Sequence, residues 1–159
     1  MTVPVAKVDA QAAVSAARDE LIEISLDIHA HPELAMEEKR ASGLLADRLE
    51  ARGFAVERGA FGLETAFRAR WGEGPVTIAY LCEYDALPEI GHACGHNLIA
   101  TAGLGGALGL KGAISPDAVT LLVLDMLRAP RAQPASPERG PAGPAPGAHG
   151  NVAAGPAGD

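Results

Sequence analysis

The hydrophobic positions in the first third of the chain recur at three- and four-residue spacing, the repeat of a helix with one buried face. Asp9 caps the first helix that this pattern predicts, and Pro32 ends it, because the residue before a proline avoids helical backbone angles. The apolar positions of this helix are Ala13, Val14, Ala17, Leu21, Ile24 and Ile28. A second helix is predicted over residues 36–52, with Glu37 and Glu38 in its first turn and Gly53 as its C-cap.

The repeat then shortens to two residues, which is typical of strands. A short strand is predicted at residues 54–56, and residues 64–71 alternate between apolar and polar side chains. Residues 76–82 are almost all apolar, which predicts a central strand covered on both faces, and residues 118–124 predict another buried strand. Because helices alternate with apolar strands, we expect an α/β sandwich.

A helix rich in glycine and alanine is predicted between these last two strands, over residues 98–111. Each glycine inside a helix costs about 1 kcal/mol relative to alanine. We therefore expect the glycines of this helix to allow close packing against a neighbour, and they are Gly103, Gly105, Gly106 and Gly109.

The pattern ends at about residue 125. About two-thirds of residues 128–159 are Ala, Pro or Gly, and Val152 is the only large aliphatic side chain there. Such a segment cannot bury enough apolar surface to fold, so we expect a structured domain over residues 1–125 and a disordered tail over residues 126–159. Out-of-frame codons of a GC-rich gene would give this composition, so a frameshift is our hypothesis for the tail.

Composition and charge narrow the possible classes of protein. The hydrophobic content of 48% suits a globular domain, and the formal net charge of −7, without a cluster of Lys or Arg, argues against a nucleic acid partner. No apolar run is long enough to cross a membrane, and the N-terminus lacks the pattern of a secretory signal. We therefore expect a soluble cytoplasmic protein whose two cysteines are reduced.

Carboxylates, histidines and thiols gather in residues 82–97, directly after the most apolar strand. In an extended segment, alternate side chains point to the same side, so Cys94 and His96 could reach one metal ion while Gly95 keeps the backbone slim. A thiolate and an imidazole suit zinc or a similar transition metal. The alternative is a buried thiol near a loop histidine.

Several neighbours of this pair are further candidates to line the site. Asp85 would orient a metal-binding histidine, or bond the backbone of the turn before Pro88. Glu83 and His92 would line the site, or serve only the loop. Residues outside the pair's loop are interpreted as structural: Cys82 as a core residue, and His29 and His31 as part of a helix end.

Two segments carry a resemblance to a known family. They are Leu-Cys-Glu-Tyr-Asp-Ala-Leu-Pro at residues 81–88 and Gly-His-Ala-Cys-Gly-His-Asn-Leu-Ile-Ala at residues 91–100, supported by residues 29–34, 53–56 and 65–71. Over residues 20–124 the chain resembles the zinc-dependent peptidase and amidohydrolase family, in its branch similar to β-alanyl-lysine dipeptidase.

The resemblance implies the N-terminal part of a catalytic domain with a mixed sheet flanked by helices. It also implies hydrolysis of an amide bond in a dipeptide or N-acyl amino acid by a water activated between two metal ions. Zinc is the expected metal, with manganese or cobalt as alternatives. Cys94 and His96 match the paired metal ligands of the family. A homodimer is implied for the full-length family, and nothing in this chain supports one.

One departure from the family concerns catalysis. In the family, the strand matching residues 119–124 is followed by a Gly-Thr-Pro-Ala-Glu-Glu-like segment, which supplies the general-base glutamate and a further ligand. This chain reads Asp125-Met-Leu-Arg-Ala-Pro instead, and the later histidines and the dimerisation domain have no match. Asp125 is too short to be assumed a substitute. We therefore expect weak metal binding, no retained catalytic residue and little activity.

Two other functional classes remain open. The chain could be a noncatalytic binding or regulatory fragment that pairs through an exposed sheet edge. It could also be a cysteine hydrolase with Cys94 as the nucleophile and His96 or His92 as the base, which we rank last because neighbours two apart point alike.

Overall fold

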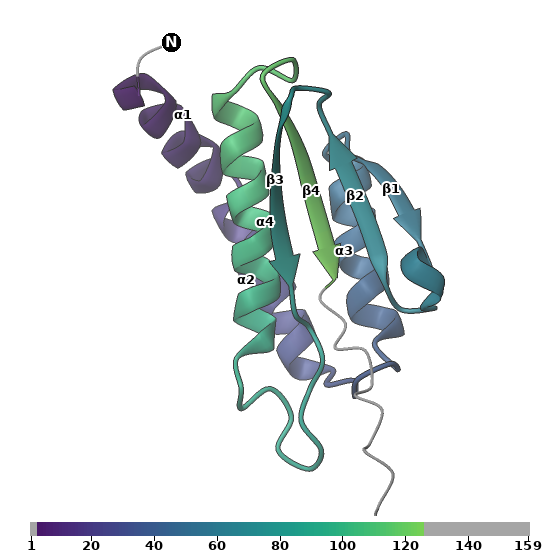
Figure 1. The fold of residues 1–159 in the computed structure, drawn as a ribbon. Coiled ribbons are helices and arrows are strands. Elements are labelled where there is room, and N and C mark those ends of the chain that lie inside the picture. The colour runs from purple at the N-terminus through teal and green to yellow at the C-terminus, as the bar shows by residue number, and fades with distance from the viewer. Residues whose placement is uncertain (1–2, 126–159) are drawn as a thin grey trace, which may run out of the picture. The chain divides into compact units, whose positions relative to one another are not determined.

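The computed structural model describes residues 3–125, in which helices and strands alternate as the sequence predicts (Figure 1). The helices are α1 (Val3–Ala16), α2 (Arg18–Ala30), α3 (Lys39–Ala51) and α4 (His96–Ala113), with a short 3₁₀ turn, η1 (Ala60–Gly62). The strands are β1 (Ala55–Arg58), β2 (Phe67–Trp71), β3 (Val76–Cys82) and β4 (Val119–Asp125). The mixed α/β class is confirmed. The predicted tail at residues 126–159 lies outside the described residues.

The first predicted helix is two helices in the structure, and Asp9 lies inside α1, so the prediction that Asp9 is its N-cap is wrong. The break is at Ala17, whose backbone has φ −91° and ψ 0°. Backbone hydrogen bonds continue across it, since the Ala17 amide reaches the Ala13 carbonyl at 3.2 Å and the Leu21 amide reaches the Ala17 carbonyl at 2.9 Å. The break is therefore a kink, at a residue that no glycine or proline marks.

The second predicted helix begins three residues late, at Lys39. Met36 has a left-handed backbone with φ 72°, which excludes it from a helix. Glu38 is only 1% exposed, and its carboxylate accepts hydrogen bonds from the Met36 amide and the Thr65 hydroxyl. The expectation that Glu37 and Glu38 form the first turn is therefore wrong, because Glu38 turns inward.

The four strands form one sheet in the order β1-β2-β4-β3. β2 pairs antiparallel with β1 and β4, while β3 and β4 are parallel and joined by α4. β4 takes the interior position, so β3 lies at an edge of the part of the sheet that the structure describes. Val76 and Leu81 are 55% and 45% exposed, and the prediction of a strand covered on both faces is wrong for β3.

The core lies between one face of the sheet and the helices (Figure 1). In β2, Phe67 and Ala69 are fully buried, whereas Arg68 and Arg70 between them are exposed on the other face. Leu45 of α3, Leu104 of α4 and Leu121 of β4 belong to the same core. Among residues 3–125, no helix is long and apolar enough to cross a membrane.

The glycines of α4 face close neighbours, as predicted. A Cβ atom on Gly106 would lie 2.5 Å from Cε1 of Tyr80, and one on Gly109 would lie 2.9 Å from Cγ2 of Val14. On Gly105, a Cβ would lie 3.1 Å from Cδ1 of Leu21. These glycines let α4 approach the neighbouring helices and β3, and so fix the helix that begins at the candidate site.

Candidate metal centre

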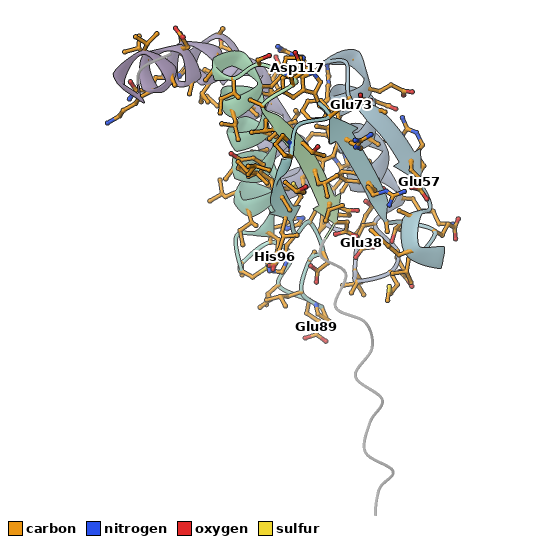
Figure 2. The ribbon with its side chains drawn as sticks, turned by 45° about the horizontal axis from the view of Figure 1, so that its top comes forward. Glu38, Glu57, Glu73, Glu89, His96 and Asp117 are labelled. Carbon is orange, nitrogen blue, oxygen red and sulfur yellow. The ribbon has the colours of Figure 1, made fainter. Side chains whose placement is uncertain are left out.

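The connection from β3 to α4 carries the candidate side chains, and its first residues keep the alternation of a strand. Cys82, Tyr84 and Ala86 are 0%, 1% and 3% exposed, whereas Glu83 and Asp85 between them are partly exposed. Glu83 and Asp85 therefore share one side of the chain. Figure 2 shows His96 at the same end of the sheet as Glu38 and Glu89, far from Glu73 and Asp117 at the opposite end.

His96 is the first residue of α4, and both of its ring nitrogens lie beside carboxylates. Nδ1 is 2.7 Å from Oδ1 of Asp85 and 2.9 Å from the Asp85 carbonyl oxygen. Nε2 is 3.1 Å from Oε2 of Glu83. A histidine whose Nδ1–H is held by a carboxylate presents Nε2 to a metal. The role of Asp85 in orienting a metal ligand stays a prediction, and its hydrogen bond to His96 is present.

Cys94 lies in an exposed turn, so the extended backbone on which its pairing with His96 was argued is wrong. Gly95 between them has φ 81° and ψ 20°, a left-handed conformation, and caps the N-terminus of α4. A Cβ atom on Gly95 would meet nothing within 4 Å. The backbone angle, rather than a lack of space, therefore requires glycine here. Metal binding by Cys94 and His96 together stays a prediction.

The donor atoms fit a transition metal, but they do not form a complete set. Thiolate, imidazole and carboxylate are the ligands that zinc takes in proteins. Within residues 3–125, however, no group of three or more His, Cys, Asp or Glu side chains is arranged to hold a metal ion. Any site formed by Cys94 and His96 therefore needs further ligands, beyond those that this part of the chain brings together.

His92 is buried beside α2. It is 6% exposed, its ring centroid is 6.3 Å from that of His29, and neither of its ring nitrogens has a hydrogen-bond partner. Burial lowers the pKa of His92, and the nearby His29 and His96 lower it further. His92 is therefore held neutral at physiological pH, and a role toward a substrate stays a prediction.

The residues interpreted as structural are so in the structure. His31 caps the C-terminus of α2, and its Nδ1 lies 2.8 Å from the Asp27 carbonyl oxygen. Cys82 is fully buried in the core, and burial raises the pKa of its thiol to about 12. Cys82 and Cys94 are both free thiols.

A buried polar cluster beneath the site was missed from the sequence. It consists of Glu38, Thr65, Tyr84 and Asp125, which come from four separate parts of the chain. The Tyr84 hydroxyl donates to the Thr65 carbonyl at 2.7 Å, and the Thr65 hydroxyl donates to Oε2 of Glu38 at 2.8 Å. The only signal in the sequence is a polar side chain within or closing an apolar run, as at Tyr84 and Asp125.

Asp125 ends β4 directly opposite Cys82 of β3. It is 8% exposed, and its Oδ2 has no hydrogen-bond partner. Burial raises the pKa of Asp125 to about 7, the Tyr84 hydroxyl opposes this rise, and the nearby charges of Glu38, Asp85 and Glu83 add to it. Asp125 is therefore a carboxyl group that holds its proton close to neutral pH.

Comparison with known proteins places this architecture. No family model matches the chain. The Xaa-Arg dipeptidase of Mus musculus is 45% identical over 126 residues, covering 70% of this chain and 29% of the relative. The p-aminobenzoyl-glutamate hydrolase of Escherichia coli, in one of its component chains, is 37% identical, covering 62% of this chain and 24% of the relative. The chain thus spans less than a third of the length of these curated relatives.

A solved structure shows the same fold with a TM-score of 0.57. It is the YXEP protein of Bacillus subtilis, described as a dinuclear metal binding peptidase from the M20 family, which is 25% identical. The match covers 70% of this chain and 35% of that chain. The chain therefore belongs to the M20 family of peptidases and amidohydrolases, with residues 3–125 corresponding to the N-terminal part of its catalytic domain.

Proposed function

We propose that the site at the end of β3 serves the hydrolysis of an amide bond in a dipeptide or N-acyl amino acid, with a divalent metal ion. Zinc is the proposed metal, and manganese and cobalt are the alternatives. The observation that carries the proposal is the orientation of His96, whose Nδ1 is held by Asp85 at 2.7 Å. The names of the relatives, among them a dipeptidase at 45% identity and a dinuclear metal binding peptidase, support the reaction class.

Each residue has a distinct task in this proposal. Cys94 and His96 donate Sγ and Nε2 to the metal, and Asp85 keeps the proton on Nδ1 so that the lone pair of Nε2 is available. A bound divalent ion would lower the pKa of a water and polarise the amide carbonyl. Glu83 lies at the nitrogen that faces the metal, so its carboxylate would be the nearest further oxygen donor.

We further propose that residues 1–159 alone bind metal weakly and hydrolyse amides slowly. Two ligands hold a metal far less tightly than a full set. Hydrolysis also needs a base that takes a proton from water and returns it to the leaving amine. Asp125 stands where the resemblance places the start of the base-bearing segment, and it is buried at the end of β4.

Titration with Co²⁺, observed by its absorption, tests the metal site directly. We expect the wild-type chain to show a thiolate-to-cobalt band in the near ultraviolet, which Cys94→Ser removes and His96→Ala weakens at least tenfold in affinity. The matched control is Cys82→Ala, because Cys82 is buried in the core away from solvent. Absence of the band in the wild-type chain at millimolar Co²⁺, or its survival in Cys94→Ser, would refute the site.

An assay of amide hydrolysis tests the reaction class. We expect release of arginine from a dipeptide ending in arginine, above the rate of the chelator-treated protein and far below that expected of an enzyme with its full ligand set. A rate equal to the chelator-treated control, in a chain that binds Co²⁺, would limit the function to metal binding.

A noncatalytic binding role is a second candidate, and the edge of β3 favours it. β3 carries no charged residue and no proline between Val76 and Cys82, the features by which edge strands avoid pairing with other chains. We expect Ala79→Lys, at an exposed position of this strand, to reduce any self-association seen by sedimentation. Self-association that Ala79→Lys leaves unchanged would exclude pairing through this edge.

The cysteine hydrolase reading is not proposed. A nucleophilic cysteine needs a base in hydrogen-bond reach. The ring nitrogens of His96 face Asp85 and Glu83, and those of His92 have no hydrogen-bond partner at all. Neither imidazole is therefore paired with Cys94.

A further inference from the structure

Tyr84 lies between the two carboxylates that flank His96. Because side chains alternate along residues 82–86, Glu83 and Asp85 share the partly exposed side of the chain and Tyr84 points into the core. Glu83 lies 3.1 Å from Nε2 of His96, and Asp85 lies 2.7 Å from Nδ1. The conformation of this one short segment therefore sets both contacts to the imidazole.

The pairing of β3 with β4 ends just before this segment, at Cys82 opposite Asp125. Beyond it, no ladder of strand hydrogen bonds holds Glu83 and Asp85. The next backbone contact is that of the Ala86 amide with the Glu33 carbonyl, at 2.7 Å. Something other than the sheet must therefore hold the backbone between Cys82 and Ala86, where the carboxylates arise.

The Tyr84 side chain makes contacts that can do this. It is 1% exposed, and it is the largest of the fully buried side chains. Its ring stacks on Phe67 of β2, with centroids 6.0 Å apart and planes inclined by 6°. Its hydroxyl donates to the Thr65 carbonyl at 2.7 Å.

The partners of Tyr84 are themselves held in place. Phe67 is fully buried in the core. The Thr65 hydroxyl donates to Oε2 of Glu38 at 2.8 Å, and Oε1 of the same carboxylate accepts the Met36 amide at 2.9 Å. A continuous series of buried contacts thus runs from the start of α3, through Thr65, to Tyr84.

We propose that Tyr84 is a positioning residue, whose buried ring and hydroxyl hold Glu83 and Asp85 against the two ring nitrogens of His96. The consequence for metal binding rests on the function proposed above, whereas the effect on His96 does not need a metal. Fixing the carboxylates keeps the proton on Nδ1 and the ring at one angle, which lowers the entropy that metal binding must otherwise remove.

Tyr84→Phe tests this inference, because it keeps the ring and its stacking but removes the hydrogen bond to Thr65. The matched control is Tyr80→Phe, which removes a hydroxyl two residues before the end of β3 and touches neither carboxylate. The first measurement is the ¹⁵N NMR signal of the His96 ring in the metal-free chain. We expect the wild type and Tyr80→Phe to show one Nδ1-protonated form, and Tyr84→Phe to show a mixture of tautomers.

The second measurement is the affinity for Co²⁺, at a temperature where thermal unfolding shows each variant to be folded. We expect Tyr84→Phe to bind about threefold to tenfold more weakly than wild type, and Tyr80→Phe to bind equally well. If Tyr84→Phe does not fold, Thr65→Val replaces it, because that change releases Thr65 from Glu38 and so loosens the acceptor of the Tyr84 hydroxyl.

The outcomes separate this inference from the proposed function. Unchanged His96 ring signals in Tyr84→Phe, or in Thr65→Val where that variant replaces it, overturn the role of Tyr84. A wild-type chain that binds no Co²⁺ overturns the metal site, while a change in the His96 tautomer in Tyr84→Phe would still support the positioning role.

Discussion

The Sγ atom of Cys82 lies so close to Gly103 that a Cβ atom on this glycine would come within 2.6 Å of the sulfur. Cys82 is the last residue of β3, and its thiol lies 3.5 Å from the Ala100 carbonyl oxygen of α4. The contact thus fixes the spacing of strand and helix directly beneath the segment that carries Glu83 and Asp85.

We predict that Gly103→Ala lowers the free energy of unfolding by about 1–3 kcal/mol, because the added methyl group overpacks this contact. The loss should exceed the gain of about 1 kcal/mol in helix propensity. Gly43→Ala in α3 is the control, since its Cβ would meet nothing within 4 Å, and it should raise the stability by about 1 kcal/mol. Urea denaturation measures both. Equal stabilisation by the two changes would show that α4 and β3 are not tightly packed.

Asp85→Asn should weaken the affinity for Zn²⁺ by about tenfold to a hundredfold, because an amide no longer holds the proton on Nδ1 of His96. Competition with a chromophoric chelator measures the change. Asp117→Asn is the control, since Asp117 is exposed at the opposite end of the sheet (Figure 2). An Asp85→Asn chain that binds zinc as tightly as wild type would mean that this hydrogen bond does not orient the ligand.

The stability of the chain should depend on pH through Asp125. Its pKa is raised from 3.8 to about 7 in the folded chain, so the folded state binds more protons than the unfolded state between these values. The contribution of Asp125 to stability therefore falls as the pH rises through this window. Asp125→Asn removes the cost of a buried charge, and we expect it to be more stable than wild type at pH 8 by about 2 kcal/mol, with the difference vanishing near pH 4.

Urea unfolding at several pH values between 4 and 8 checks this prediction. Glu73→Gln is the control, because Glu73 is exposed in the turn between β2 and β3. A difference between Asp125→Asn and wild type that stays constant across the range would show that Asp125 ionises normally in the folded chain.

The local features of this fold could be predicted from the sequence. Helical periodicity located most of the buried residues of α2 and α3, and the glycines of α4 correctly indicated close packing. These predictions succeed because each depends on residues a few positions apart. The same holds for the family, since residues 81–100 form one nearly continuous motif.

The remaining features depend on contacts between distant residues, which spacing along the chain does not encode. The edge position of β3 follows from β4 pairing between β2 and β3, more than 35 residues later in sequence order. The contact of Tyr84 with Thr65 joins residues 19 apart, and that of Asp85 with His96 joins residues 11 apart. At Gly95, the residue type was informative, but its left-handed backbone gives Cys94 and His96 a geometry that an extended segment would not have.

The last prediction concerns this glycine. With φ 81° at Gly95, an alanine would be strained, so Gly95→Ala should lower the free energy of unfolding by about 1–2 kcal/mol. Gly95→Asn should cost less, because asparagine tolerates the left-handed region better. Both changes leave Cys94 and His96 in place. If the turn aligns these two ligands, the Co²⁺ affinity should fall in the same order, with Ala weaker than Asn and Asn weaker than wild type. Stability and affinity that do not change in either variant would show that the entry into α4 does not require this conformation.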